Sequence, residues 1–181
     1  MQIDGVGARS TGRARPGDVP RLVVTIGDSF TFGDEVADAE SWPAYLEARL
    51  SESGEETGVV NLGVNAYGLD QAVLRFERDG APLRPDIAIL GLQPENLLRA
   101  LNVVRPIFFA GTDLPFSKPR FVADGDGWVV VNRPALDPGG VLRLLQRPGD
   151  HPLLENEFWL DDRYRASVFD ASTLASKTDA R

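Results

Sequence analysis

The sequence predicts an α/β fold with a mostly parallel sheet that helices cover on both faces. Three short apolar runs, at residues 21–26, 59–62 and 86–90, alternate with segments of helical periodicity. This alternation with short connections is typical of βαβ units, in which a crossover helix joins two parallel strands. In the second half, a glycine-rich turn between two apolar runs predicts a β-hairpin beside the sheet.

Each element of the first half has a local signal. Residues 21–26 are rich in β-branched side chains and end at Gly27, as expected for a buried parallel strand. A helix is expected at 41–50, because Ser41 is a favourable N-cap and Pro43 suits the first turn. The other elements expected here are a strand at 59–62, a helix at 69–78 that stops at Gly80, a strand at 86–90 and a helix at 97–101.

The pattern changes after about residue 104. The runs 121–123 and 128–131 flank a DGDG turn and predict the hairpin, and residues 139–146 suggest a short helix. We therefore expect an irregular N-terminal lead-in at 1–20, an α/β core at 21–104, and an insertion with a hairpin and a mixed C-terminal region at 105–181. Three strands are few for a doubly wound sheet, so we expect the domain to be incomplete.

Composition excludes several classes of function. The chain of 181 residues has a net charge of −8, which repels phosphate backbones and disfavours nucleic-acid binding. Without cysteine there is no disulfide framework, thiolate site or cysteine nucleophile, and one histidine leaves no multi-histidine site, so we expect neither metal nor cofactor. No apolar run reaches the ~20 residues that cross a bilayer, so no membrane span is expected. The sequence leaves the localisation undecided between the cytoplasm and, if the chain is a fragment, the periplasm or the cell exterior.

Residues suited to acyl transfer follow each predicted strand. Ser29 lies in the GDSFTFG turn at 27–33, residues 61–68 offer backbone N–H donors, and Asn96 or Gln93 offers a side-chain amide. The carboxyl ends of parallel strands meet at one edge of a sheet, so these groups are expected to converge. Taken singly, each has a structural alternative, in which Ser29 and Asn96 cap helices and 61–68 is an ordinary turn.

These motifs resemble a known family. GDSFTFG at 27–33, NLGVNAYGLDQ at 61–71 and PEN at 94–96 are similar to the first three sequence blocks of the SGNH/GDSL hydrolases. These enzymes are flavodoxin-like, three-layer α/β/α esterases and acylhydrolases, some of which act on acetylated carbohydrate. The resemblance covers about residues 21–102 and implies a small-molecule or carbohydrate ester as the substrate.

The resemblance also implies roles for individual residues. Ser29 is the expected nucleophile, and its own N–H is one donor to the oxyanion. Ala66 stands where the family usually has glycine, and its N–H serves as the second donor if the backbone angles suit an ordinary residue. Asn96 is the expected side-chain donor, although Gln93 occupies the register that a strict reading assigns to asparagine.

The family's catalytic base is the largest departure. An Asp-x-x-His pair normally supplies it, whereas here Pro148 stands three residues before the one histidine, His151, and Asp150 is adjacent. We interpret His151 as a loop residue and the chain as part of a longer SGNH protein, weakly active or inactive by itself. The alternatives are a non-catalytic glycan- or protein-binding module, and an O-acyltransferase. The acyl group, the alcohol and the oligomeric state are not predicted by this sequence.

Overall fold

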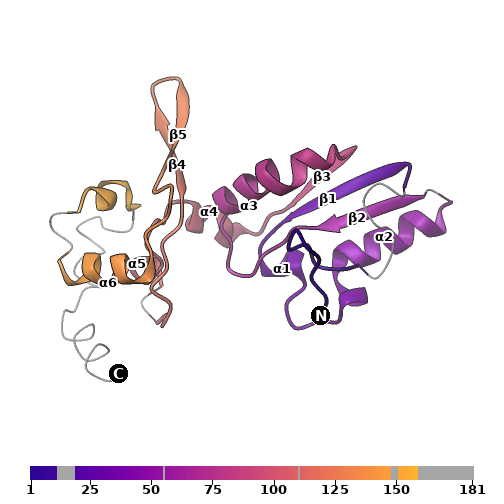
Figure 1. The fold of residues 1–181 in the computed structure, drawn as a ribbon, viewed down its shortest axis with the longest axis horizontal. Helices are drawn as coiled ribbons and strands as arrows, with labels where there is room; N and C mark the ends of the chain where they lie inside the picture. Colours follow the sequence, from indigo (N-terminus) through magenta and orange to yellow (C-terminus); the bar gives the residue numbers. More distant parts are fainter. Residues whose placement is uncertain (12–18, 55, 110, 148–150, 159–181) are drawn as a thin grey trace. The chain divides into compact units, whose positions relative to one another are not determined.

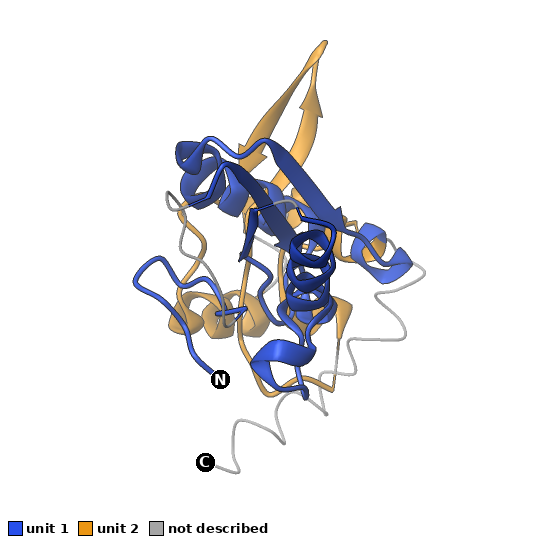
Figure 2. Ribbon diagram, turned by 90° about the vertical axis from the view of Figure 1, so that its right-hand side faces the viewer, with its two compact units in different colours: residues 1–97 blue, residues 98–181 orange. Residues whose placement is uncertain are grey.

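The computed structural model describes residues 1–11, 19–54, 56–109, 111–147 and 151–158. The chain divides into two compact units, residues 1–97 and 98–181 (Figure 2), and each is described here by itself. The sheet that the sequence predicts lies in the first unit and the hairpin in the second. Within the described ranges, no helix is long and apolar enough to cross a membrane.

The first unit contains a parallel sheet of three strands in the order β2-β1-β3 (Figure 1). The strands are β1 (Arg21–Gly27), β2 (Thr57–Asn61) and β3 (Ile87–Gly91), and Val24 of β1 lies beside Val60 and Ala88. Residues 22–27 of the central strand are buried. The predicted α/β fold with a parallel sheet is therefore confirmed, with the strand ends shifted slightly.

Helices lie on both sides of these strands, with α3 on one side and α1 and α2 on the other (Figure 1). Alternate side chains of a strand point to opposite faces, so Leu22, Val24 and Ile26 of β1 form one core cluster with Ala72 of α3. The side chain of Glu47 on α2 accepts a hydrogen bond from the N–H of Val59 in β2. The helices are α1 (Ser29–Phe32), α2 (Trp42–Glu52), α3 (Leu69–Arg75) and α4 (Pro94–Ala100).

The segment predicted as a helix at 69–78 is helical, but only its first part is an α-helix. The α-helix ends at Arg75, a π-helical turn follows at Phe76–Gly80, and a 3-10 turn at Ala81–Leu83. The wider turn brings the Phe76 ring against Gly80, where an added Cβ would lie 2.6 Å from a ring carbon. The helix predicted at 97–101 begins earlier, at Pro94, because proline suits the first position of a helix.

The edge strand β3 differs from the other two strands in burial. Its pattern is largely exposed, with Ile87 45% and Leu90 40% exposed, whereas β2 is buried throughout. Among the described residues, β1 is the one strand that pairs with β3. Complete coverage of the predicted sheet on both faces is therefore found at β1 and β2 and not at β3.

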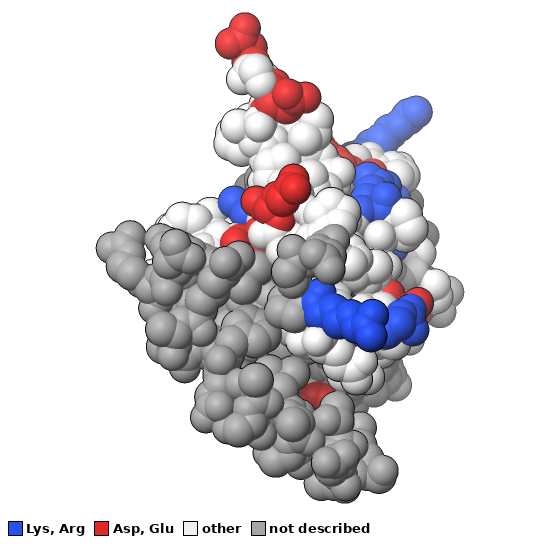
Figure 3. Space-filling model, turned by 90° about the vertical axis from the view of Figure 1, so that its left-hand side faces the viewer, with Lys and Arg blue, Asp and Glu red and all other residues white. Residues whose placement is uncertain are grey.

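The second unit contains the predicted β-hairpin. Strands β4 (Arg120–Asp124) and β5 (Gly127–Val131) are antiparallel, and acidic side chains lie at the hairpin tip (Figure 3). Helices α5 (Arg105–Phe108) and α6 (Pro138–Gln146) and a 3-10 helix at Pro152–Asn156 complete its described elements. The core of this unit consists of the buried side chains of Val103, Val104, Ile107, Val141, Leu144, Leu145 and Leu153. Most of the C-terminal region, 159–181, lies outside the described residues.

Candidate active site

Ser29 lies at the turn between the central strand and the first helix. β1 ends at Gly27, and α1 begins two residues later at Ser29 itself. Glycine is needed at 27, because an added Cβ would lie 2.3 Å from Oγ1 of the fully buried Thr31. Ser29 is partly exposed, and within the described ranges neither its hydroxyl nor its N–H has a hydrogen-bond partner. The hydroxyl is therefore open to a ligand.

The loops that follow β1, β2 and β3 are named the first, second and third loop in that order. Asp28, the residue before Ser29, connects the first loop to the third. This side chain is buried, and its Oδ1 accepts the N–H of Phe30 at 2.9 Å, which caps α1. Its Oδ2 accepts both Gln93 Nε2 at 2.7 Å and Asn96 Nδ2 at 2.8 Å. The two amides that the sequence left as alternatives thus bind the same carboxylate oxygen, directly beside the serine.

The side chain of Asn96 is bonded at both of its ends. Its Oδ1 accepts the N–H of Gln93 at 3.3 Å, just before α4, and its Nδ2 donates to Asp28. A backbone N–H only donates and an ionised carboxylate only accepts, so this pair of partners determines the amide orientation. The nitrogen carries two hydrogens, and the second has no acceptor among the described residues. Asn96, in the first turn of α4, therefore bonds back to the residue before the helix and still holds a spare donor hydrogen.

The second loop packs against the backbone of α1. Asn61 Nδ2 donates to the carbonyl of Thr31 at 2.9 Å, and the N–H of Val64 donates to the carbonyl of Gly27 at 3.0 Å. Gly63 approaches so closely that an added Cβ would lie 2.3 Å from the nitrogen of Phe32. These contacts hold the loop after β2 beside the turn that carries Ser29.

Ala66 lies further along this second loop, in a conformation that glycine favours. Its φ is +65°, in the left-handed region, which an L-residue such as alanine adopts only at a cost in free energy. The adjacent Tyr67 N–H donates to the carbonyl of Val64 at 3.2 Å, and Asn65 Nδ2 donates to Asp34 Oδ2 at 2.7 Å. The N–H of Ala66 has no acceptor in the part of the chain that the structure describes.

The one histidine belongs to the second unit. His151 stands at the start of the 3-10 helix at Pro152–Asn156, where its Nδ1 accepts the N–H of Leu153 at 3.2 Å. When Nδ1 accepts in this way, a neutral ring carries its proton on Nε2. Pro148 and Asp150, which the sequence analysis compared with the family's acid–base pair, lie outside the described residues.

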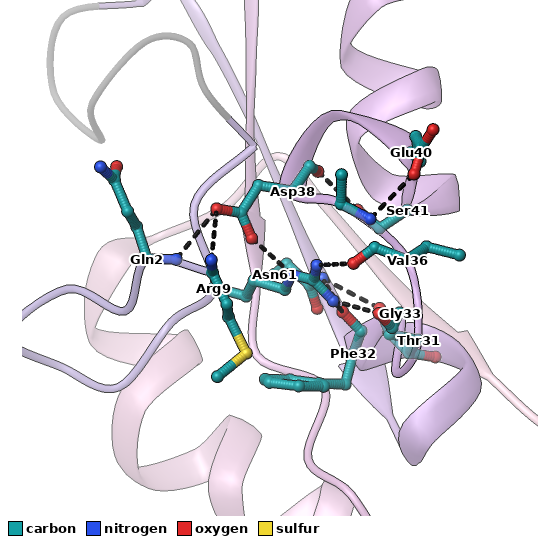
Figure 4. A network of polar contacts seen from close by, with 12 residues as sticks. Gln2, Arg9, Thr31, Phe32, Gly33, Val36, Asp38, Glu40, Ser41 and Asn61 are labelled. Carbon is teal, nitrogen blue, oxygen red and sulfur yellow. Dashed lines mark hydrogen bonds and ion pairs between the residues drawn. The ribbon is translucent and has the colours of Figure 1, made fainter.

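Arg9, in the expected lead-in, makes contacts with the segment after Ser29 that sequence reasoning missed. It is 3% exposed, and its guanidinium donates to the carbonyls of Phe32 at 2.8 Å and Val36 at 2.6 Å, to the carbonyl of Gly33 and to Asp38 Oδ1 at 2.9 Å (Figure 4). Burial raises the pKa of Asp38, but hydrogen bonds from Arg9 and the Gln2 N–H outweigh it, so the pKa lies below its ordinary value. No pattern near residue 9 marks these contacts, because most of the acceptors are backbone carbonyls.

Comparisons with known proteins found similar solved structures. No protein-family model matches the chain, and neither does any curated protein. The structure matches AlinE4, an SGNH-hydrolase family esterase, over 88% of this chain and 72% of that chain, with 23% identity and a TM-score of 0.40. An aspartate-to-alanine mutant of AlinE4 matches with the same values. A serine-to-alanine mutant of AlinE4 matches at 31% identity and a TM-score of 0.40 over 45% of this chain, which spans 44% of that protein's length.

Proposed function

We propose that this chain performs serine ester chemistry of the SGNH type, with Ser29 as the nucleophile. The observation that carries the proposal is the convergence of the three loops on the turn at Ser29. Asp28 binds the third loop through Gln93 and Asn96, and the second loop is bonded to Gly27 and to α1. The Ser29 hydroxyl, the Ala66 N–H and one hydrogen of Asn96 Nδ2 have no partner among the described residues, which supports a role for them in binding a ligand.

The chemistry follows from these groups. The Ser29 oxygen attacks the carbonyl carbon of the ester, its proton passes to a base, and the carbonyl oxygen becomes an oxyanion. The backbone N–H groups of Ser29 and Ala66 and the spare hydrogen of Asn96 Nδ2 are the proposed donors to it, and removing one such donor typically costs about 10²–10³ in kcat. When the intermediate collapses, the bond to the leaving oxygen breaks and this oxygen takes up the proton that Ser29 lost, so the alcohol is released and an acyl group stays on Ser29. Water then attacks the acyl carbon, which releases the carboxylic acid and restores the Ser29 hydroxyl.

The catalytic base is the part of this proposal with the least support among the described residues. His151 is occupied as a cap in the second unit, and a serine without a paired histidine is poorly activated. We therefore propose slow turnover for the chain by itself, on a small-molecule or carbohydrate ester.

A fluorophosphonate probe tests the nucleophile, because it forms a stable covalent adduct with an activated serine. The full chain is incubated with the probe at pH 7 and at pH 9, and the adduct is read by intact mass and peptide mapping. We expect one adduct on the wild type, faster at pH 9, and none on Ser29→Ala. Ser53→Ala is the matched control, since this exposed serine at the end of α2 lies outside the site and its loss leaves labelling unchanged. An adduct on Ser29→Ala, or an unlabelled wild type, rejects the proposal.

The hydrogen bond that His151 Nδ1 accepts from the Leu153 N–H favours one alternative from another class, a non-catalytic module that binds a glycan or a protein. In that case the open donors near Ser29 hold a ligand without cleaving it. The wild type would hydrolyse no p-nitrophenyl ester, and Ser29→Ala would bind a glycan array as the wild type does. Loss of ester hydrolysis on Ser29→Ala, with the fold intact by circular dichroism, decides for the esterase.

A further inference from the structure

We propose that Arg9 is a positioning residue of the candidate active site, so that residues 1–11 are part of its machinery rather than a lead-in. The effect of Arg9 on the reaction rests on the proposed function. Its structural basis is the guanidinium of Arg9, which is bonded to the segment that directly follows Ser29.

The guanidinium holds the end of α1 in place. α1 has four residues, so it is too short to be stable by its own hydrogen bonds, and it ends at Gly33 in the left-handed conformation. The carbonyls of Phe32, Gly33 and Val36 all accept from Arg9, and the guanidinium carbon lies 5.1 Å from the centre of the Phe32 ring. Together with the Asp28 cap at the other end, Arg9 therefore fixes the turn on both sides of Ser29.

Only arginine supplies this number of donors in one plane. A guanidinium has five N–H groups in a rigid fork, and here it reaches three carbonyls and the carboxylate of Asp38 while its side chain is 1% exposed. A lysine ammonium has three donors and a flexible stem, so it cannot satisfy four acceptors that are spread over residues 32–38. A buried carbonyl left without a donor destabilises the loop.

Arg9 also connects the first loop to the second. Its own N–H donates to the carbonyl of Asn61 at 2.9 Å, and the Asn61 side chain in turn donates to the carbonyl of Thr31. Figure 4 shows Arg9, Asn61 and the end of α1 close together. Displacing Arg9 therefore perturbs the loop that carries Ser29 and the strand end that leads to Ala66 at the same time.

A purely structural role is the competing explanation, in which Arg9 merely anchors the N-terminal segment. The chain offers a matched control, because a second arginine holds the same segment at another point. Arg75 on α3 donates from Nη2 to the carbonyls of Gly7 at 2.7 Å and Val6 at 3.4 Å. Its Nε forms an ion pair with Asp79, and none of these partners lies in 28–38. Loosening the segment at Arg75 leaves the guanidinium of Arg9 and its acceptors in place.

The experiment compares Arg9→Lys, Arg9→Met and Arg75→Met with the wild type as full chains, below all unfolding midpoints. The first readout is the rate of fluorophosphonate labelling of Ser29, and the second is hydrogen exchange of the amides in 28–38. A misplacement of about 1 Å at a reacting group costs on the order of 10²-fold in rate. We expect labelling to fall at least tenfold in Arg9→Lys and further in Arg9→Met, with exchange in 28–38 at least tenfold faster. Arg75→Met should change both readouts by less than twofold.

Two results overturn the inference. One is an Arg9→Lys variant that labels and exchanges in 28–38 as the wild type does, and the other is an Arg75→Met variant that labels as slowly as Arg9→Lys. Should Arg9→Met fail to fold, the milder Arg9→Lys and the exchange data still decide. An unlabelled wild type would reject the proposed function instead, and the exchange in 28–38 would then decide by itself whether Arg9 orders the turn.

Discussion

Replacing Ala66 with glycine should relieve strain in the second loop without removing the donor that it contributes. Ala66 has a φ of +65°, and the left-handed region costs an L-residue roughly 1–2 kcal/mol relative to ordinary angles. Glycine avoids this cost but loses about 0.5–1 kcal/mol more through its greater conformational entropy in the unfolded chain. The half-buried methyl group contributes roughly a further 0.4 kcal/mol that the variant gives up. The net change is therefore close to zero or slightly stabilising.

A matched alanine makes this small net effect measurable. Ala37 is exposed and has a φ of −67°, so Ala37→Gly carries the same entropy cost without any relief of strain. The difference between the two variants is the left-handed cost less the contribution of the half-buried Ala66 methyl group, so Ala66→Gly should be more stable than Ala37→Gly by about 0.6–1.6 kcal/mol. Urea dependence of hydrogen exchange at the amides of β1 reports the free energy of unfolding of the first unit. Equal stability of the two variants would show that Ala66 is not strained.

The same variant also tests the role proposed for the backbone of Ala66. An N–H group survives the loss of Cβ, so fluorophosphonate labelling of Ser29 in Ala66→Gly should stay within about twofold of the wild type. A large loss of labelling would mean that the Ala66 side chain, rather than its N–H, contributes to the reaction.

Carboxylates that accept several hydrogen bonds give three further predictions. Asp28→Asn replaces a carboxylate that accepts from Phe30, Gln93 and Asn96 with an amide that faces the other two amides. In urea unfolding, this variant should lower the stability of the first unit by about 2–3 kcal/mol, and it should slow the labelling of Ser29. In the second unit, Glu157 Oε2 accepts the N–H groups of Val103 at 2.7 Å and Val104 at 2.8 Å, so Glu157→Gln should cost about 1.5–3 kcal/mol and speed the exchange of both amides. The pKa of Asp38 is lowered in the folded chain, so its contribution to stability is present above the unfolded pKa of about 4 and is lost as the pH falls through the folded value. Acid titration of the unfolding free energy should therefore show a shallower decline in Asp38→Asn than in the wild type, and parallel curves would contradict this linkage.

Local signals explain why much of the first unit was predictable from its sequence. The apolar run at 21–26 predicts β1, because a buried strand requires apolar residues. The glycine that follows marks the turn, because a Cβ at position 27 would clash with Thr31. The sequence allows a cap of the following helix at Ser29, whereas in the structure the cap is Asp28, the residue before it. The sequence predicts that the loops meet at one edge of the sheet, but not that Gln93 and Asn96 bind the Asp28 carboxylate.

The contacts of Arg9 and Glu157 could not be predicted in the same way. Their partners include backbone groups of residues distant in sequence, and such groups are present at almost every position. The left-handed angle at Ala66 could not be predicted either, since alanine ordinarily indicates a right-handed helix. Periodicity likewise could not show that the helix at 69–78 widens at Phe76, because an α- and a π-helical turn differ by one residue in their hydrogen bonding.

The two-ended bonding of Asn96 restricts how this chain can change over evolution. One side-chain atom must accept from the N–H of Gln93 while another donates to Asp28, and among side chains of this length only an amide does both. A mutation to aspartate would set two carboxylates against each other, and one to leucine would leave Asp28 with fewer donors. Substitutions at positions 28 and 96 are therefore coupled. Replacing either residue alone would remove the hydrogen bond that holds the third loop beside Ser29, even while the serine is retained.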